Sequence, residues 1–273
     1  MSKYEYTDYI RTDRLPLFYC PGCGSGIVFQ ALTRALAKLE IDPHKTVIVC
    51  GIGCWGNIDR YFKTNALHGT HGRTLAFATG VKLANPELTV IAIVGDGDGI
   101  TIGGNHFIQA CRRNIDITCV MLNNQNYGMT GGQVSATTPH NAITSTTKYG
   151  NIEYAFNISK VAAACGANYS ACSTAYHPQM IQKQIEEGIQ TKGFSSIEVI
   201  SPCTAGFDKY NKRGTIPEMY AYLKEHAVPY VKGKSDESQL GEGQFFTGVI
   251  HKSSHPDFIT SYEELRARVT NRK

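Results

Sequence analysis

Asp96 and Asn124 are two residues with hard side-chain oxygen atoms that follow neighbouring apolar runs of the chain. Asp96 lies in the Gly-Asp-Gly-Asp turn at 95–98, and a helical pattern and a strand separate it from Asn124. Mg²⁺ prefers octahedral coordination by oxygen and usually binds a few protein oxygens together with substrate phosphates. The pair therefore predicts a magnesium site that holds a diphosphate group. The structural alternative is a simple turn followed by an Asn-rich loop.

The nine cysteines form two groups according to their sequence surroundings. Five lie inside apolar strand or helix patterns and are expected to be small buried side chains: Cys50, Cys111, Cys119, Cys165 and Cys172. Four lie among Gly and Pro residues, where an irregular backbone lets several thiolates converge: Cys20, Cys23, Cys54 and Cys203. Cys50 competes with Cys54 for the third position, but it ends an apolar run. Four thiolates can hold zinc or an iron–sulfur cluster, and the single C-x-x-C pair followed by two distant cysteines favours a cluster.

These motifs together resemble the β subunit of the 2-oxoacid:ferredoxin oxidoreductases over about residues 11–203. The resemblance is carried by Cys-Pro-Gly-Cys-Gly at 20–24, Gly-Ile-Gly-Cys at 51–54, His-Gly-Arg at 71–73, Phe-Ala-Thr-Gly at 77–80, Gly-Asp-Gly-Asp at 95–98 and Tyr-Gly-Met-Thr-Gly-Gly-Gln at 127–133. Residues 84–86, 102–106 and 110–114 look like the 2-oxoglutarate type. Trp55 and Asn57 depart from the small and basic residues of relatives, so pyruvate or a branched-chain 2-oxo acid stays an alternative substrate.

The resemblance implies an enzyme that binds thiamine diphosphate, Mg²⁺ and a 4Fe-4S cluster. It would oxidatively decarboxylate a 2-oxo acid with coenzyme A and ferredoxin, giving acyl-CoA, CO₂ and reduced ferredoxin. The expected cluster ligands are Cys20, Cys23, Cys54 and Cys203, and the expected magnesium ligands are Asp96, Asn124 and the backbone carbonyl of Asn126. The residues expected to contact the cofactor are Ile52, Gly53, Cys54, Trp55, His71, Gly97, Asp98, Gly128 and Met129.

The chain reads as only the diphosphate-binding half of a thiamine enzyme. The glutamate that such enzymes place against the aminopyrimidine ring is therefore expected on a partner α subunit, and ferredoxin is expected to dock near the cluster. Three other classes of function compete. A non-oxidative thiamine decarboxylase subunit leaves the cysteines unexplained, a zinc-ribbon binding module leaves the magnesium motif unexplained, and a structural subunit with a relic site explains only the fold.

Composition excludes several other functions. The net charge of the 273 residues is +4, and no basic block interleaved with aromatic residues points to nucleic acid. No run of about 18 apolar residues predicts a membrane span. Residues 1–12 are polar and charged, without the apolar core of a signal peptide. A cytoplasmic location is therefore expected.

Helix and strand patterns alternate along the chain. Helices are expected at 26–39, 73–83, 104–113, 158–164 and 178–189, and strands at 47–49, 88–94, 117–122 and 197–200. Continuous apolar strands separated by helices predict an α/β doubly wound parallel sheet, which the resemblance identifies as a thiamine diphosphate-binding (diphosphate half) fold. Ligands of such sheets bind at the carboxyl ends of the strands, where Cys54, Asp96, Asn124 and Cys203 are expected.

Two segments have a different composition. The Gly-, Thr- and Asn-rich loop at 124–151 is long, so we expect it to wrap the diphosphate and to meet a partner. Residues 1–206 are predicted to form the cofactor- and cluster-binding domain, and 207–273 a more polar C-terminal extension that either contacts another subunit or forms a solvated tail. Two short helices are expected in the extension from the capping-box pairs Thr215/Glu218 and Ser261/Glu264, with an exposed turn at 232–237.

Overall fold

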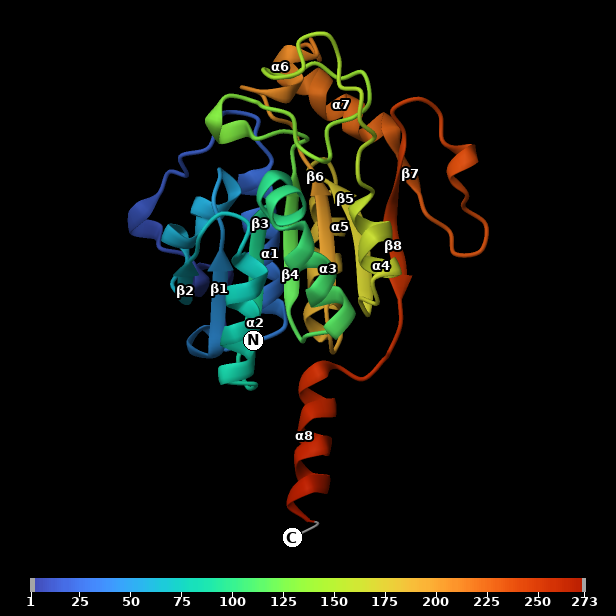
Figure 1. Cartoon of the computed structure of the whole chain (residues 1–273). Coiled ribbons are helices and arrows are strands. Elements are labelled where there is room, and N and C mark those ends of the chain that lie inside the picture. The colour runs from blue at the N-terminus through green and yellow to red at the C-terminus, as the bar shows by residue number, and fades with distance from the viewer. Residues whose placement is uncertain (1–2, 272–273) are drawn as a thin grey trace.

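The centre of the molecule is an eight-stranded sheet, seen in a computed structural model that describes residues 3–271 (Figure 1). Its strands are β1 (Thr46–Cys50), β2 (Asn65–His68), β3 (Thr89–Gly95), β4 (Thr118–Asn123), β5 (Tyr169–Thr174), β6 (Ser195–Ile200), β7 (Ala227–Pro229) and β8 (Phe245–Lys252). They lie in the order β2-β1-β3-β4-β6-β5-β8-β7. The first six strands are parallel, and β8 runs antiparallel to β5. The predicted doubly wound sheet is confirmed, with an antiparallel addition at one edge.

Helices cover both faces of the sheet (Figure 1). The helices of the first face are α1 (Ser25–Lys38) and α5 (Pro178–Gln190), and those of the second are α2 (Thr74–Ala84), α3 (Gly104–Arg113) and α4 (Ile158–Ala164). Side chains alternate along each strand, so Ile48 and Ile91 join the first core whereas Val47 and Val90 join the second. Burial on both sides explains the continuous apolar runs in these strands.

Sequence patterns located the central elements to within about three residues, but they missed four strands. The helices expected at 104–113 and 158–164 have the bounds of α3 and α4. β5 was missed because it is buried yet rich in small polar residues, among them Ser170 and Ser173. β2 was missed because every residue of this edge strand is exposed. β7 and β8 lie in the segment interpreted as an extension.

Residues 207–271 form three α-helices, α6 (Phe207–Tyr210), α7 (Ile216–His226) and α8 (Phe258–Thr270), and one short 3-10 helix (Glu237–Gln239). α7 begins at the predicted capping box, where the Glu218 carboxylate accepts a hydrogen bond from the Thr215 backbone N–H at 2.6 Å. α8 begins earlier than predicted, because Asp257 caps it in place of Ser261. α8 buries none of its residues and projects away from the sheet (Figure 1). Within residues 3–271, no helix is both long and apolar enough to cross a membrane.

Candidate active site

One small cavity gathers the loops that follow β1, β2, β3 and β4. The parallel strands end at the same edge of the sheet, so residues far apart in sequence meet there. The cavity encloses about 90 Å³. It is lined by all nine residues expected to contact the cofactor and by the three expected magnesium ligands. Ligand sites usually enclose about 300–1,000 Å³, so this chain can surround only part of a cofactor-sized molecule.

Three polar groups converge inside the cavity, from Asp96, Asn124 and Asn126. The Asn124 side-chain amide presents one end to the backbone carbonyl oxygen of Asn126 at 2.7 Å and to Asp96 Oδ1 at 3.1 Å. With the amide oxygen at that end, three acceptors face one another. Neighbouring oxygen ligands of an octahedral Mg²⁺ ion lie about 2.9 Å apart, because each Mg–O distance is about 2.0–2.1 Å. The three residues therefore fit a magnesium ion. Rotation of the amide would instead make Asn124 a hydrogen-bond donor to the other two.

Asp96 is a buried carboxylate with no cationic side chain beside it. Its side chain accepts hydrogen bonds from the hydroxyl groups of Ser135 at 2.6 Å and Thr137 at 2.7 Å. Burial raises the pKa of this carboxyl, against the opposing effect of these hydrogen bonds. No ion pair among residues 3–271 includes Asp96. A bound cation would offset the cost of burying its charge. The roles of Ser135 and Thr137 were missed, since nothing near them in sequence suggests them.

Asp98 is a second buried carboxylate, and it joins three loops. Asp98 Oδ1 lies 2.6 Å from His71 Nδ1 and accepts hydrogen bonds from the backbone N–H groups of Gly72 at 2.7 Å and Ile52 at 3.2 Å. Asp98 Oδ2 accepts a hydrogen bond from the Thr74 hydroxyl at 3.1 Å. Because a carboxylate only accepts, His71 carries its proton on Nδ1. Asp98 thus orients His71 and the backbone at Ile52, and its contact with the cofactor stays a prediction.

Gly97 and Trp55 determine how closely the cavity walls approach. A Cβ atom on Gly97 would lie 2.5 Å from the Tyr127 ring, so only glycine fits there without rearrangement. The Trp55 indole is 2% exposed and donates its N–H to the backbone oxygen of Val120 at 3.2 Å. Trp55 therefore lines the cavity with ring carbons, while its polar atom is bound to the sheet.

The four cysteines expected to hold a cluster lie in one neighbourhood. Burial raises the pKa of the Cys54 thiol to about 11, and the nearby thiols of Cys23, Cys203 and Cys20 add to the shift. Burial likewise raises the pKa of Cys203, and Cys23 adds to that shift. The four-thiolate site is nevertheless not assembled, because no group of three or more His, Cys, Asp or Glu side chains within residues 3–271 is arranged to hold a metal ion. The cluster therefore stays a prediction.

The remaining cysteines lie in secondary structure or directly after it. Those buried as expected are Cys50, Cys111, Cys119 and Cys172. Cys165 caps the end of α4 and is only half-buried. The prediction that Cys50 belongs to the core is confirmed, since its side chain is 0% exposed within the first core. Desolvation raises the pKa of the Cys50 thiol well above its ordinary value.

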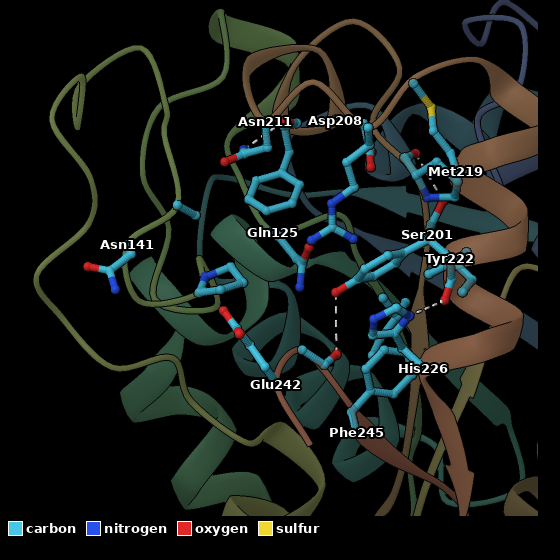
Figure 2. A pocket seen from close by; sticks show the side chains of 18 of the residues that line it. Gln125, Asn141, Ser201, Asp208, Asn211, Met219, Tyr222, His226, Glu242 and Phe245 are labelled. Carbon is cyan, nitrogen blue, oxygen red and sulfur yellow. Dashed lines mark hydrogen bonds between the residues drawn. The ribbon is translucent and has the colours of Figure 1, made fainter. Parts of the chain in front are cut away.

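A larger cavity of about 590 Å³ lies between the loop that follows β4 and the segments that follow β6 (Figure 2). Tyr222 and His226 of α7 stack there with ring centroids 3.7 Å apart, and the Arg213 guanidinium lies 3.5 Å from the Tyr222 ring centroid. The Tyr222 hydroxyl donates a hydrogen bond to the backbone oxygen of Gly243 at 3.4 Å, which joins α7 to the segment before β8. Gln125 reaches this cavity, so the turn at 124–126 lies between two cavities.

Comparison with known proteins shows the family of this chain. Residues 51–199 match the family model described as thiamine pyrophosphate enzyme, C-terminal TPP binding domain. A protein of Archaeoglobus fulgidus named 2-oxoglutarate synthase subunit KorB is 47% identical, over 98% of this chain and 96% of the relative. A Sulfolobus protein named 2-oxoacid:ferredoxin oxidoreductase subunit beta is 34% identical, over 90% of this chain and 84% of the relative.

One solved structure is similar over nearly the whole chain. It is the 2-oxoglutarate:ferredoxin oxidoreductase from Magnetococcus marinus with 2-oxoglutarate, coenzyme A and succinyl-CoA bound. The TM-score is 0.87 at 30% sequence identity, and the match covers 99% of this chain and 92% of the other. The similarity therefore extends to β8 and to the segment after 206.

Proposed function

We infer the function of this chain from the family to which it belongs, the β subunits of the 2-oxoacid:ferredoxin oxidoreductases. The chain is a subunit of an oxidoreductase with a thiamine diphosphate-binding domain. The proposed reaction converts 2-oxoglutarate, coenzyme A and oxidised ferredoxin to succinyl-CoA, CO₂ and reduced ferredoxin. The names of relatives such as the Archaeoglobus fulgidus protein and the ligands of the Magnetococcus marinus structure support 2-oxoglutarate as the substrate.

The observation that carries this proposal is the convergence of the Asp96, Asn124 and Asn126 oxygens in one cavity. We propose that they hold Mg²⁺, which would in turn hold the diphosphate. Gly97 and Gly128 allow the backbone to approach the cofactor closely. When bound, thiamine diphosphate supplies the chemistry that cleaves the 2-oxo acid. His71, oriented by Asp98 through Nδ1, would present Nε2 as a hydrogen-bond acceptor from a fixed position at the cavity wall.

We also propose that the thiols of Cys20, Cys23, Cys54 and Cys203 bind the 4Fe-4S cluster. The position of Cys54 in the cavity lining and of Cys203 next to Gly128 supports this assignment. A Cβ atom on Gly128 would lie 3.2 Å from Cys203 Sγ, so this thiol lies next to the cavity wall. Ferredoxin would then dock near Cys20, which is exposed.

Reconstitution with the α subunit tests the proposed function. The purified chain alone is expected to show no CoA-dependent oxidation of 2-oxo acids, because a half-site cannot hold the reacting groups in a fixed geometry. Adding the α subunit should produce reduction of a viologen dye with 2-oxoglutarate and coenzyme A. At matched subsaturating concentrations, faster reduction with pyruvate or a branched 2-oxo acid would contradict the assignment of 2-oxoglutarate as the substrate. Turnover by this chain alone, free of α, would contradict the composite site.

We propose that the α subunit docks on a projecting part of the long loop. Four large apolar side chains are displayed within eight residues of it: Tyr149 (105% exposed), Ile152 (86%), Tyr154 (86%) and Phe156 (52%). The loop is nevertheless held in place, because the Asn151 amide donates hydrogen bonds to the backbone oxygens of Thr138 at 2.9 Å, Glu153 at 3.1 Å and Pro139 at 3.3 Å. Clusters of exposed apolar side chains mark interaction sites.

The position of this cluster indicates that its partner is the subunit that completes the cavity. The same segment between β4 and α4 also contains Ser135 and Thr137, which hydrogen-bond to Asp96, a proposed magnesium ligand. A partner seated on residues 149–156 would therefore also reach the edge of the sheet where the cofactor is proposed to bind. The enzyme names of the relatives, which specify a β subunit, support the existence of such a partner.

The variant Ile152→Asp is expected to weaken association with the α subunit by about tenfold or more, equivalent to about 1.4 kcal/mol. Burying an unpaired carboxylate in an apolar interface is costly. Ile108→Asp is the matched control, because Ile108 is 39% exposed on α3. Titration by calorimetry or light scattering measures both. Equal weakening by the two variants, or none by Ile152→Asp, would remove this loop from the interface.

A further inference from the structure

Glu198 is a buried carboxylate that the proposed site does not use. It lies in β6 beside Met121 of β4 and is 6% exposed. Its Oε1 accepts a hydrogen bond from Asn123 Nδ2 at 2.8 Å, and its Oε2 accepts a longer one from the Ser159 hydroxyl at 3.4 Å. Burial raises the pKa of this carboxyl to about 7, against the effect of both hydrogen bonds. Asn123 is therefore the closer partner of a group that is expensive to bury.

Asn123 connects this carboxylate to the magnesium-binding turn. It is the last residue of β4 and is 4% exposed. Its amide nitrogen is bound to Glu198, and its Oδ1 accepts a hydrogen bond from the backbone N–H of Gln125 at 3.0 Å. Gln125 is the residue between Asn124 and Asn126, which supply two of the three converging oxygens. A single side chain thus separates Glu198 from the turn.

The turn needs such an anchor because Gln125 has an unfavourable backbone conformation. Its φ angle is +62°, in the left-handed region that residues with a side chain rarely adopt. Two hydrogen bonds hold Gln125 in this conformation. Its backbone N–H donates to the Asn123 amide oxygen, and its carbonyl oxygen accepts from the Thr138 hydroxyl at 2.7 Å. Strain of this kind persists only where surrounding contacts enforce it.

The direction of the hydrogen bonds shows how Glu198 fixes the orientation of the Asn123 amide. An asparagine amide has one accepting end and one donating end, and Gln125 needs the accepting end. A carboxylate only accepts, so it holds the donating end of Asn123 and leaves Oδ1 facing Gln125. Without an acceptor at position 198, the donating end of the amide loses its partner, and only the Gln125 N–H still fixes the orientation of Asn123.

We propose that Glu198 is a positioning residue for the magnesium-binding turn, which acts through the Asn123 amide to keep the oxygens of Asn124 and Asn126 aimed at one point. This inference rests on the magnesium site proposed above. Outer partners of metal ligands commonly have this role, and their loss typically lowers metal affinity about 10- to 100-fold.

The test measures the Mg²⁺ concentration that half-saturates thiamine diphosphate binding, by equilibrium dialysis of the complex with the α subunit. Glu198→Met removes the acceptor while nearly keeping the volume, and it should raise this concentration about tenfold or more. Glu198→Gln should restore it to near the wild-type value, because a glutamine oxygen still accepts from Asn123. Glu186→Met is the matched control. Glu186 of α5 is also a buried carboxylate, 8% exposed, and it forms an ion pair with Lys38 of α1 at 2.7 Å.

The outcomes separate this inference from the magnesium site itself. Cofactor binding by the wild type that does not depend on Mg²⁺ would overturn the site. Mg²⁺-dependent binding that Glu198→Met leaves unchanged would overturn only the role of Glu198, as would an equal shift in Glu186→Met or no rescue by Glu198→Gln. If Glu198→Met does not fold, Asn123→Ser replaces it, since this change removes the bridging amide. If the Asn123→Ser variant folds and needs the same Mg²⁺ concentration as the wild type, the proposal is refuted.

Discussion

Replacing Asp96 with alanine is expected to abolish retention of thiamine diphosphate while the chain stays folded. Asp96 is the one charged residue among the three proposed magnesium ligands, so the loss of affinity should exceed the about 10- to 100-fold caused by losing an outer partner. The fold should survive because the hydroxyl groups that bind Asp96, those of Ser135 and Thr137, lie 3.0 Å apart and can hydrogen-bond to each other.

Mass analysis of the purified complex with the α subunit measures cofactor content, and circular dichroism reports folding. Asp59→Ala is the control: Asp59 lies outside the cavity lining and its carboxylate is 3.1 Å from His68 Nδ1. This variant should keep the cofactor. Normal cofactor content in Asp96→Ala would show that the three converging oxygens are not the metal site.

Serine at Cys20, Cys23, Cys54 or Cys203 is expected to eliminate or strongly destabilise an iron–sulfur chromophore in anaerobically purified protein. Thiolates are the ligands that such clusters require, and a hydroxyl group is a much poorer ligand for them. Loss of the cluster should remove ferredoxin reduction, because the chain then has no acceptor for the electrons. Visible absorption and analysis of iron and sulfide measure the effect.

Cys50→Ala and Cys172→Ala are the controls, since both thiols are buried in the sheet. They should leave iron and sulfide content unchanged. Unchanged content in Cys203→Ser would remove Cys203 from the ligand set. Loss of the cluster in Cys50→Ala but not in Cys54→Ala would show that the other member of this pair binds it.

The central fold was predictable because its strands are buried on both faces. Such strands must be apolar throughout, so β1, β3 and β4 are visible as continuous runs. The position of the candidate site followed from the same reasoning, since parallel strands end together and Asp96 and Asn124 each follow a strand. Local sequence patterns were sufficient to predict these strands and the site beside them. Burial makes each strand apolar along its length, and the change to polar residues marks where the strand ends.

The remaining features depend on contacts between residues distant in sequence. β5 is buried but half polar, and its pairing with β6 and β8 compensates for that composition. Asp98 looks like a cofactor contact from its motif, yet its oxygens bind His71 and Thr74, more than twenty residues away. Glu198 is a buried acid in a strand, which local propensity disfavours. Only the tertiary structure shows that its partner is Asn123.

The exposed apolar side chains at 149–156 make the unpaired chain prone to unwanted association in the cell. Until the proposed partner covers them, Tyr149, Ile152 and Tyr154 are available to any other apolar surface. Such patches promote aggregation of an orphan subunit and attract chaperones and proteases. Synthesis of the two subunits in equal amounts, close together in time, would keep the lifetime of the unpaired chain short. The geometry that completes the enzyme thus also favours balanced production of its parts.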